Sequence, residues 1–551
     1  MPTPSHTRYQ RIRIENDDDI ARLYPLITDY LRDPTLAESV TELILTKTAP
    51  SHDDSHLGTK NAKINEEEAT RTVSRNSPFL APINQLGVPD DKVDVWLRVL
   101  TWMDPEMKAS REGARDPKWG TKVSFPSRDS LFAHHAAMML IALCPNIERL
   151  TLRDPGYNSP IEDVLIRNNY GQMPGKFLQK LKHVSLLATN DLLISDERFF
   201  TTMNFLGLFR LFHRLPVVQS IDVGGITEDD AGSDWCMHPP HTANFDTIQV
   251  THSDLSSNFL ASLIGAPKAL RNFAMSLGGR ANQDGGHGMM RPRDLGMALY
   301  LQKNTLEKLD LDVDEYVYGE FVETEDHLAD NAVHEAAVLE YHREDAYFMI
   351  DAANSPVTLP LSQQPLTRTY GSTIGSLHDF SALTHLAIGI NTLLGPTGEP
   401  PFMLVDALPK TLQSLLLRGY EAGVNSVHDA HVEELMNKRE KALPGLREVY
   451  GVDVVIPSST LIEDPDEASE TGSILWEPEE TETEWLEEEK AAVSGEDVKR
   501  TGKRKLEEAE QEEEEEEEEE ATSPGEDVKK TGKRKLEETD EEEVEEDKQE
   551  D

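Results

Sequence analysis

The six residues from Ile147 to Leu152, Ile-Glu-Arg-Leu-Thr-Leu, carry apolar side chains at the first, fourth and sixth positions. The last two apolar positions are two residues apart, so on an extended strand their side chains point to one face and the residue between them points to the other. On a helix the same two side chains would lie on different sides. The stretch therefore predicts a short strand that buries one of its faces.

This spacing returns along the chain and forms an internal repeat of ten copies. The clear copies after the first are Leu181–Leu186, Val218–Val223, Phe245–Val250, Leu270–Met275, Leu306–Leu311, Leu383–Ile388 and Leu412–Leu417. A weaker copy lies at Val40–Leu45, and a degraded one at Leu446–Val449, where Gly451 replaces the last apolar residue. A single unit cannot bury its apolar face alone, but stacked neighbours can.

Amphipathic runs of helical character precede most of these strands, and several of them stop at a proline, which ends a helix and turns the chain. These prolines are Pro145, Pro216, Pro267, Pro409 and Pro444. From Ile147 onward, successive copies are 25 to 37 residues apart, except for the 77 residues between Leu306 and Leu383. The long step predicts an insertion within the repeat array.

The pattern resembles the leucine-rich repeat family, in the long irregular form found in F-box/leucine-rich repeat proteins of filamentous fungi. The resemblance covers about residues 20–455, and the asparagine usual at the ninth position of the family's repeat is present as Asn391. It implies an α/β fold, an irregular leucine-rich repeat solenoid of about ten strand–helix units with a curved parallel sheet. Only about twenty residues precede the first unit, too few for an F-box, so no N-terminal F-box is recognisable.

The domain organisation follows from these patterns and from composition. We expect a flexible N-terminus at 1–19, a solenoid at 20–456 with insertions at about 50–75 and 312–377, and a disordered acidic low-complexity tail at 457–551. Apolar spacing further predicts helices at Ile20–Leu31, Val93–Trp102, Leu131–Leu143 and Phe199–Phe212.

The charge balance restricts the partners. With 102 acidic and 54 basic side chains the net charge is −48, which argues against general binding to nucleic-acid backbones and favours basic partners. The two cysteines, Cys144 and Cys236, form neither a disulfide framework nor a zinc spacing, as expected in a reducing compartment. No signal peptide or membrane-spanning stretch is recognisable, so we expect a soluble intracellular protein.

Residues 463–551 carry a net charge of −28. Within them Gly495–Glu508 is repeated 30 residues later as Gly525–Glu538, a tandem duplication. Each copy contains a basic cluster that resembles a nuclear import signal. The candidate residues are Lys499, Arg500, Lys503, Arg504, Lys505, Lys529, Lys530, Lys533, Arg534 and Lys535. We therefore expect a nuclear or cytoplasmic protein, with the nucleus favoured.

No catalytic, cofactor or metal site is predicted. Adjacent residues on a helix point about 100° apart, so His134 and His135 do not share a ligand face. Asp310, Asp312 and Asp314 alternate as in a calcium loop but lack its glycine, and we interpret them as a solvated acidic strand end. No nucleophile motif or metalloprotease helix is present, which favours a protein that is not an enzyme.

A solenoid suggests binding through the strand positions that alternate with the core. These positions are Arg149, Thr151, Arg153, His183, Ser185, Ser220, Asp222, Thr247, Gln249, Thr251, Lys308, Asp310, Ser414, Leu416 and Arg418. We expect them to line a concave sheet that binds a protein partner, so the chain would be an interaction scaffold. The resemblance allows a substrate-recognition adaptor that contacts the F-box-binding linker subunit of a cullin ligase.

Two alternatives remain open. The acidic tail resembles that of the acidic leucine-rich nuclear phosphoproteins, which bind histones and other basic proteins. The combination of long repeats and an acidic tail is also similar to the activators of the nuclear-transport GTPase, which would make the chain a GTPase-activating protein.

Overall fold

The structure is a computed structural model of the 551-residue chain. It describes residues 7–46, 77–101, 103, 126–155, 159–188, 198–228, 238–281, 290, 292–317, 373–396, 402–460 and 484–487. The chain divides after Glu488, and every described residue lies in the first of the two parts. The ten basic residues of the predicted import signals and most of both predicted insertions lie outside the described residues.

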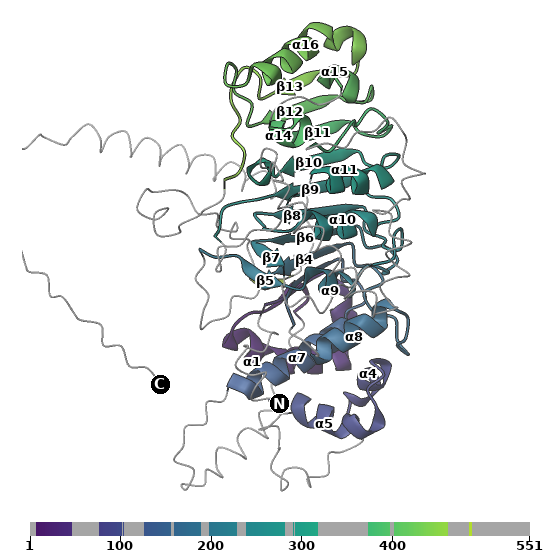
Figure 1. Cartoon of the computed structure of the whole chain (residues 1–551). Helices are drawn as coiled ribbons and strands as arrows, with labels where there is room; N and C mark the ends of the chain where they lie inside the picture. Colours follow the sequence, from purple (N-terminus) through teal and green to yellow (C-terminus); the bar gives the residue numbers. More distant parts are fainter. Residues whose placement is uncertain are drawn as a thin grey trace, which may run out of the picture. The chain divides into compact units, whose positions relative to one another are not determined.

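A twelve-stranded sheet organises the described residues. Its order is β13-β12-β11-β10-β9-β8-β6-β4-β3-β2-β1-β14, and Figure 1 shows β4 to β13 stacked in this order. The strands are β1 (Tyr9–Ile14), β2 (Glu42–Leu45), β3 (Arg149–Arg153), β4 (His183–Leu187), β6 (Ser220–Gly224), β8 (Thr247–Thr251), β9 (Asn272–Ser276), β10 (Lys308–Asp312), β11 (His385–Gly389), β12 (Ser414–Arg418), β13 (Glu448–Tyr450) and β14 (Leu486–Glu487). A separate parallel pair joins β5 (Thr201–Met203) to β7 (Ile226–Glu228).

All neighbours in the large sheet are parallel except β1 and β14. All ten predicted strand segments lie in it, and their apolar positions are in register. One row contains Leu43, Leu150, Val184, Ile221, Ile248, Phe273, Leu309, Leu386, Leu415 and Val449. Every member except Val449 is buried. The predicted α/β class with a large, mostly parallel sheet is therefore confirmed.

The residue before each strand links neighbouring units in the same way. The carbonyl of Glu148 accepts hydrogen bonds from the amides of Lys182 and His183 at 2.8 and 3.1 Å. The carbonyls of Lys182, Gln219, Asp246, Arg271, Glu307, Thr384 and Gln413 accept from the next unit in the same pattern. These bonds satisfy the backbone donors and acceptors before each strand without side-chain partners. The strands can therefore stay aligned although the connections between them differ in length.

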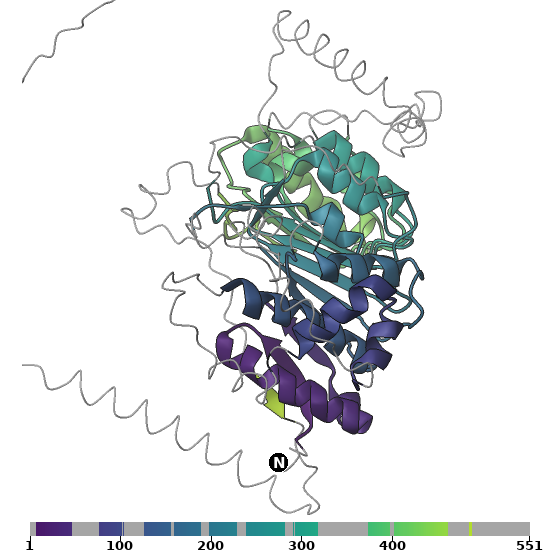
Figure 2. The ribbon, with the colours of Figure 1, turned by 90° about the horizontal axis from the view of Figure 1, so that it is seen from below.

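The helices α8, α10 and α11 lie on the same side of the sheet (Figure 2). The helices are α1 (Asp17–Arg32), α4 (Leu80–Gln85), α5 (Asp90–Leu100), α7 (Pro126–Leu143), α8 (Pro160–Asn169), α9 (Phe205–Phe209), α10 (Ser257–Gly265), α11 (Pro292–Leu301), α14 (Ile390–Leu394), α15 (Leu404–Ala407) and α16 (Ser426–Ala442), with 3-10 turns η1 (Pro34–Ser39) and η2 (Asp314–Tyr316). Neighbouring helices pack together: α1 and α8 each contact α7, and α10 contacts α11. Together they bury one face of the sheet.

Two regions differ from the sequence prediction. Residues 9–19, expected to be flexible, form β1 and the start of α1, because Ile12 and Ile14 continue the two buried rows of the sheet. The helix predicted at Phe199–Phe212 is restricted to α9, since Thr201–Met203 pairs with β7 as strand β5. Parts of the expected tail, residues 457–460 and 484–487, contact the sheet, as described below.

Candidate interaction surface

The fifteen predicted binding residues all lie on the sheet positions that alternate with the buried rows. We call these outward positions of β1–β4, β6 and β8–β13 the polar face. None of the fifteen side chains is buried, and Arg149, Gln249 and Lys308 are among the exposed ones. The structure therefore brings them onto one face.

Two hydrogen bonds join predicted residues of β4 and β6. Ser185 Oγ donates to Asp222 Oδ2 at 2.7 Å, and His183 Nδ1 lies 2.8 Å from Ser220 Oγ. Burial raises the pKa of Asp222, although the Ser185 hydrogen bond opposes the shift. Burial, together with nearby Arg149, lowers the pKa of His183. The imidazole, two hydroxyls and the Asp222 carboxyl give this part of the face several hydrogen-bonding groups.

Cations gather on the polar face near β1. Arg11 pairs with Glu42 at 2.6 Å, and Arg13 pairs with Glu15 at 2.9 Å. Arg149 and Arg153 of β3 have no carboxylate within ion-pair distance among the described residues. Partial burial also lowers the pKa of Arg153. A partner that presents carboxylates here would be attracted to these two arginines.

Acidic side chains gather instead where β10 ends. Arg418 of β12 pairs with Asp310 at 2.6 Å and lies 3.6 Å from Asp312. Asp312 also accepts hydrogen bonds from the Ser459 amide at 3.1 Å and from Ser459 Oγ at 2.7 Å. This cluster joins predicted residues to Ser459, which the sequence placed in a disordered tail.

Asp314 lies beyond the strand and is buried. Its carboxylate accepts from the amides of Asn391 and Thr392 at 2.8 and 2.7 Å, and from Thr392 Oγ1 at 2.6 Å. Burial is the main cause that raises its pKa. Since Asp312 is buried too, the interpretation of a solvated acidic strand end is wrong for these two residues. They satisfy backbone donors instead of facing water.

We name residues 451–460 the return segment, because the chain turns back after β13 and crosses the ends of earlier strands. Its Ile456 carbonyl accepts from the Gly419 amide beside β12 at 2.8 Å. Thr460 reaches Gly278 beside β9, where a side chain would overlap the Thr460 carbonyl oxygen. Gly278 has φ +82°, a conformation that favours glycine.

The opposite edge of the sheet is covered by residues 484–487, which we name the Trp485 segment. Its strand β14 pairs antiparallel with β1, with Arg11 opposite Leu486. The indole of Trp485 meets the Tyr9 ring edge-on at 5.2 Å, and the Arg22 guanidinium lies 4.0 Å from the indole centroid. An indole held by a cation and an aromatic edge is bound by interactions specific to a large aromatic ring.

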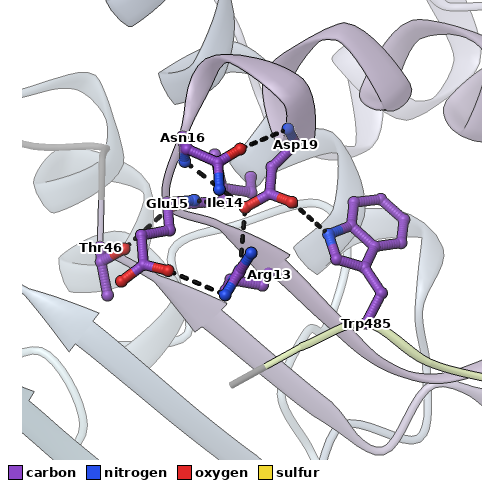
Figure 3. A network of polar contacts seen from close by, with 7 residues as sticks. All are labelled: Arg13, Ile14, Glu15, Asn16, Asp19, Thr46 and Trp485. Carbon is purple, nitrogen blue, oxygen red and sulfur yellow. Dashed lines mark hydrogen bonds and ion pairs between the residues drawn. The ribbon is translucent and has the colours of Figure 1, made fainter. Parts of the chain in front are cut away.

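Asp19 connects this segment to the start of α1 (Figure 3). Oδ2 of Asp19 accepts from Arg13 Nε at 2.9 Å and from the Glu15 amide at 3.1 Å, while Oδ1 accepts from Trp485 Nε1 at 2.8 Å. Asn16 completes a capping box with Asp19, so the carboxylate is fixed by the helix terminus. Only 2% of Asp19 is exposed. The acceptor for the indole is thus a buried, preoriented carboxylate.

His135 and His238 are two buried histidines with defined surroundings. His135 is buried, with Nδ1 2.8 Å from the Leu131 carbonyl and its ring against Trp96 at 4.6 Å, and burial lowers its pKa to about 4. His238 packs against Phe209, with Nε2 2.9 Å from the Leu206 carbonyl. Within the described ranges, no group of three or more His, Cys, Asp or Glu side chains could hold a metal ion. In the same part of the chain no helix is long and apolar enough to cross a membrane.

The chain was compared with protein families, curated proteins and solved structures. No protein-family model, curated protein or solved structure matches the chain. The arguments about function therefore depend on the residues and contacts described above.

Sequence reasoning missed Asp19, Asp314, Ser459 and Trp485 as parts of defined contacts. One signal was available for Trp485: it is a large aromatic residue within an acidic stretch. An aromatic side chain in a charged stretch is a candidate anchor, because it can bury area that its neighbours cannot.

Proposed function

We propose that the protein is a non-enzymatic interaction scaffold of leucine-rich repeat type, and that a protein partner binds its polar face. One observation carries the proposal: ten neighbouring parallel strands, β2 to β13, repeat one register, and their outward positions alternate with buried apolar rows. A series of similar strands presents side chains at intervals of about 4.8 Å, a spacing that suits an extended binding surface.

The distribution of charge supports a polar partner. Arginines gather near β1 to β3, hydrogen-bonding groups lie on β4 and β6, and carboxylates lie at β10. Charge complementarity of this kind contributes mainly to specificity and association rate. A narrower form of the same proposal is a substrate-recognition adaptor of the F-box/leucine-rich repeat type. The candidate import signals support a nuclear location.

The proposal is tested by quantitative proximity labelling with charge-reversal variants of the full chain. The face variant combines Arg149→Glu with Lys308→Glu, both exposed on the polar face, and a matched control combines Lys410→Glu with Lys441→Glu, both exposed elsewhere. We expect a set of neighbours that the face variant loses and the control retains. Identical neighbour sets for wild type and face variant would refute binding through this face.

The tail supports a second candidate function, the binding of basic proteins. Its net charge of −28 over residues 463–551 predicts attraction that weakens as salt rises. Capture of histones by the full chain and by a chain ending at residue 462 should therefore differ at low salt. Equal capture by both would exclude the tail as the binding element.

A further inference from the structure

We propose that the outer edge of β1 and the start of α1 form a binding site for extended peptides that carry a tryptophan, and that the Trp485 segment occupies this site within the chain. The inference is independent of the polar face, because the site lies at the edge of the sheet. It would give the protein a second interaction surface whose availability depends on its own C-terminal region.

The side chains of the site recognise an indole by three different contacts. Asp19 Oδ1 accepts the indole N–H, the Arg22 guanidinium covers the ring, and Tyr9 meets it edge-on. Phenylalanine is disfavoured at this position because it has no N–H group. It would leave Oδ1 of the buried Asp19 carboxylate without its hydrogen-bond donor. Among the described residues, Trp485 Nε1 is the donor to Oδ1. Oδ2 accepts its hydrogen bonds from β1 and from the turn between β1 and α1. The site is therefore complete only with an indole.

The backbone of β1 supplies the second element of recognition. The outer edge of a sheet presents unpaired backbone groups that another extended segment can pair with, a common mode of peptide binding. β1 has six residues, and among the described residues β14 pairs with it at Tyr9 and Arg11.

Among the described residues, the Trp485 segment is anchored mainly by one side chain, which suits it to exchange. Leu486 is 44% exposed and Glu484 and Glu487 are exposed, so Trp485 alone is partly covered. Binding of this segment gains from its place in the same chain, where tethering supplies an effective concentration of about 1 mM. A partner peptide with the same anchor would compete with it.

The test measures binding of a fluorescent peptide with the sequence of residues 481–489, Thr-Glu-Thr-Glu-Trp-Leu-Glu-Glu-Glu, to full-length variants by anisotropy. Trp485→Ala frees the site, so this variant should bind the peptide at least about tenfold more tightly than wild type. Adding Asp19→Asn or Arg22→Ala to Trp485→Ala should weaken binding by fivefold or more. Asp18→Asn, an exposed neighbour of Asp19, is the matched control and should have no effect.

A peptide with phenylalanine in place of tryptophan should bind at least fivefold more weakly, and circular dichroism of each variant checks that it is folded. Arg22 is exposed, so Arg22→Ala tests the site even if Asp19→Asn unfolds the start of α1. No binding to Trp485→Ala, equal binding to wild type, or binding indifferent to Asp19 and Arg22 would overturn the proposal. Dimers of Trp485→Ala detected by light scattering would also overturn it, because a second copy would then take the edge.

Discussion

The two ends of the sheet hold the C-terminal part of the chain in different ways. Near β9 to β12 the return segment makes backbone contacts, with Ile456 bonded to the Gly419 amide and Thr460 lying against Gly278. At β1 a single indole provides the main contact. Backbone contacts need a close approach and therefore constrain the residues beneath them, whereas one side chain can leave and return. We therefore expect the contacts of the return segment to be persistent and those of the Trp485 segment to open more readily.

The two ends also differ in the direction of their pH response. In α7, which packs against α1 and α5, burial lowers the pKa of His135, so the folded state disfavours the charged imidazole. Near β10, burial raises the pKa of Asp314, so the folded state disfavours the carboxylate. Acid should therefore weaken the first end and favour the second.

The largest effect is expected at Asp314. Replacement by alanine leaves two buried amides and the Thr392 hydroxyl without their acceptor, at a cost of about 3 kcal/mol in the free energy of unfolding. Asp314→Asn keeps one carbonyl oxygen and should cost less than half as much. Urea denaturation of both variants measures the difference. Equal losses would mean that the charge, and not the acceptor, stabilises α14.

The pH response gives the next largest effect. Unfolded His135 takes up a proton near pH 6.5, but folded His135 does so only near 4, so the unfolded state binds more protons between these values. The free energy of unfolding should fall by about 2 kcal/mol between pH 7 and 5 because of this residue. Urea denaturation at both pH values should show a loss that is about 2 kcal/mol smaller in His135→Gln than in wild type, because the buried His213 responds to acid in the same way in both proteins.

Asp314 is expected to change the free energy of unfolding with pH in the opposite direction. Its folded pKa lies above that of an unfolded aspartate, so its contribution to stability is present at low pH and is lost as pH rises. Relative to wild type, Asp314→Asn should then lose stability on acidification, because it lacks this compensation. The same pH dependence in wild type and Asp314→Asn would contradict the comparison between the two ends.

The strands could be predicted from the sequence because each one needs only neighbours with the same alternation. Leu150, Ile221, Leu309 and Leu415 lie in one row of the sheet, as the spacing required. The fifteen outward positions followed from the same alternation. Their pattern identifies a face, but it names no ligand for it.

The contacts of the C-terminal part could not be predicted in this way. Asp314 and Thr392 are 78 residues apart, and Asp312 and Ser459 are 147 apart, so no local pattern joins them. Strand β14 has two residues in the part of the chain that the structure describes, too few to show a strand period. β1 has the right alternation at Ile12 and Ile14, but it lies within residues 1–19, which the sequence analysis predicts to be flexible.

The return segment gives a further test at two glycines. Gly278 (φ +82°) and Gly423 (φ +90°) both adopt a conformation that costs alanine about 1–2 kcal/mol, but only Gly278 has the Thr460 carbonyl against it. Gly278→Ala should therefore destabilise the protein by about 1 kcal/mol more than Gly423→Ala. Faster hydrogen exchange at the Gly419 amide in Gly278→Ala alone would show that the return segment has moved.

The smallest effect on overall stability is expected for Trp485→Ala, about 1 kcal/mol, because the Trp485 segment is short and mostly exposed. Its matched partner is Ser459→Ala, which removes the 2.7 Å hydrogen bond to Asp312 at the other end. Hydrogen exchange should quicken in β1 for the first variant and at Gly419 for the second, each without change at the opposite end. If Trp485→Ala also loosened Gly419, the two attachments would act as one unit, and the edge of β1 could not be released while the return segment stays in place.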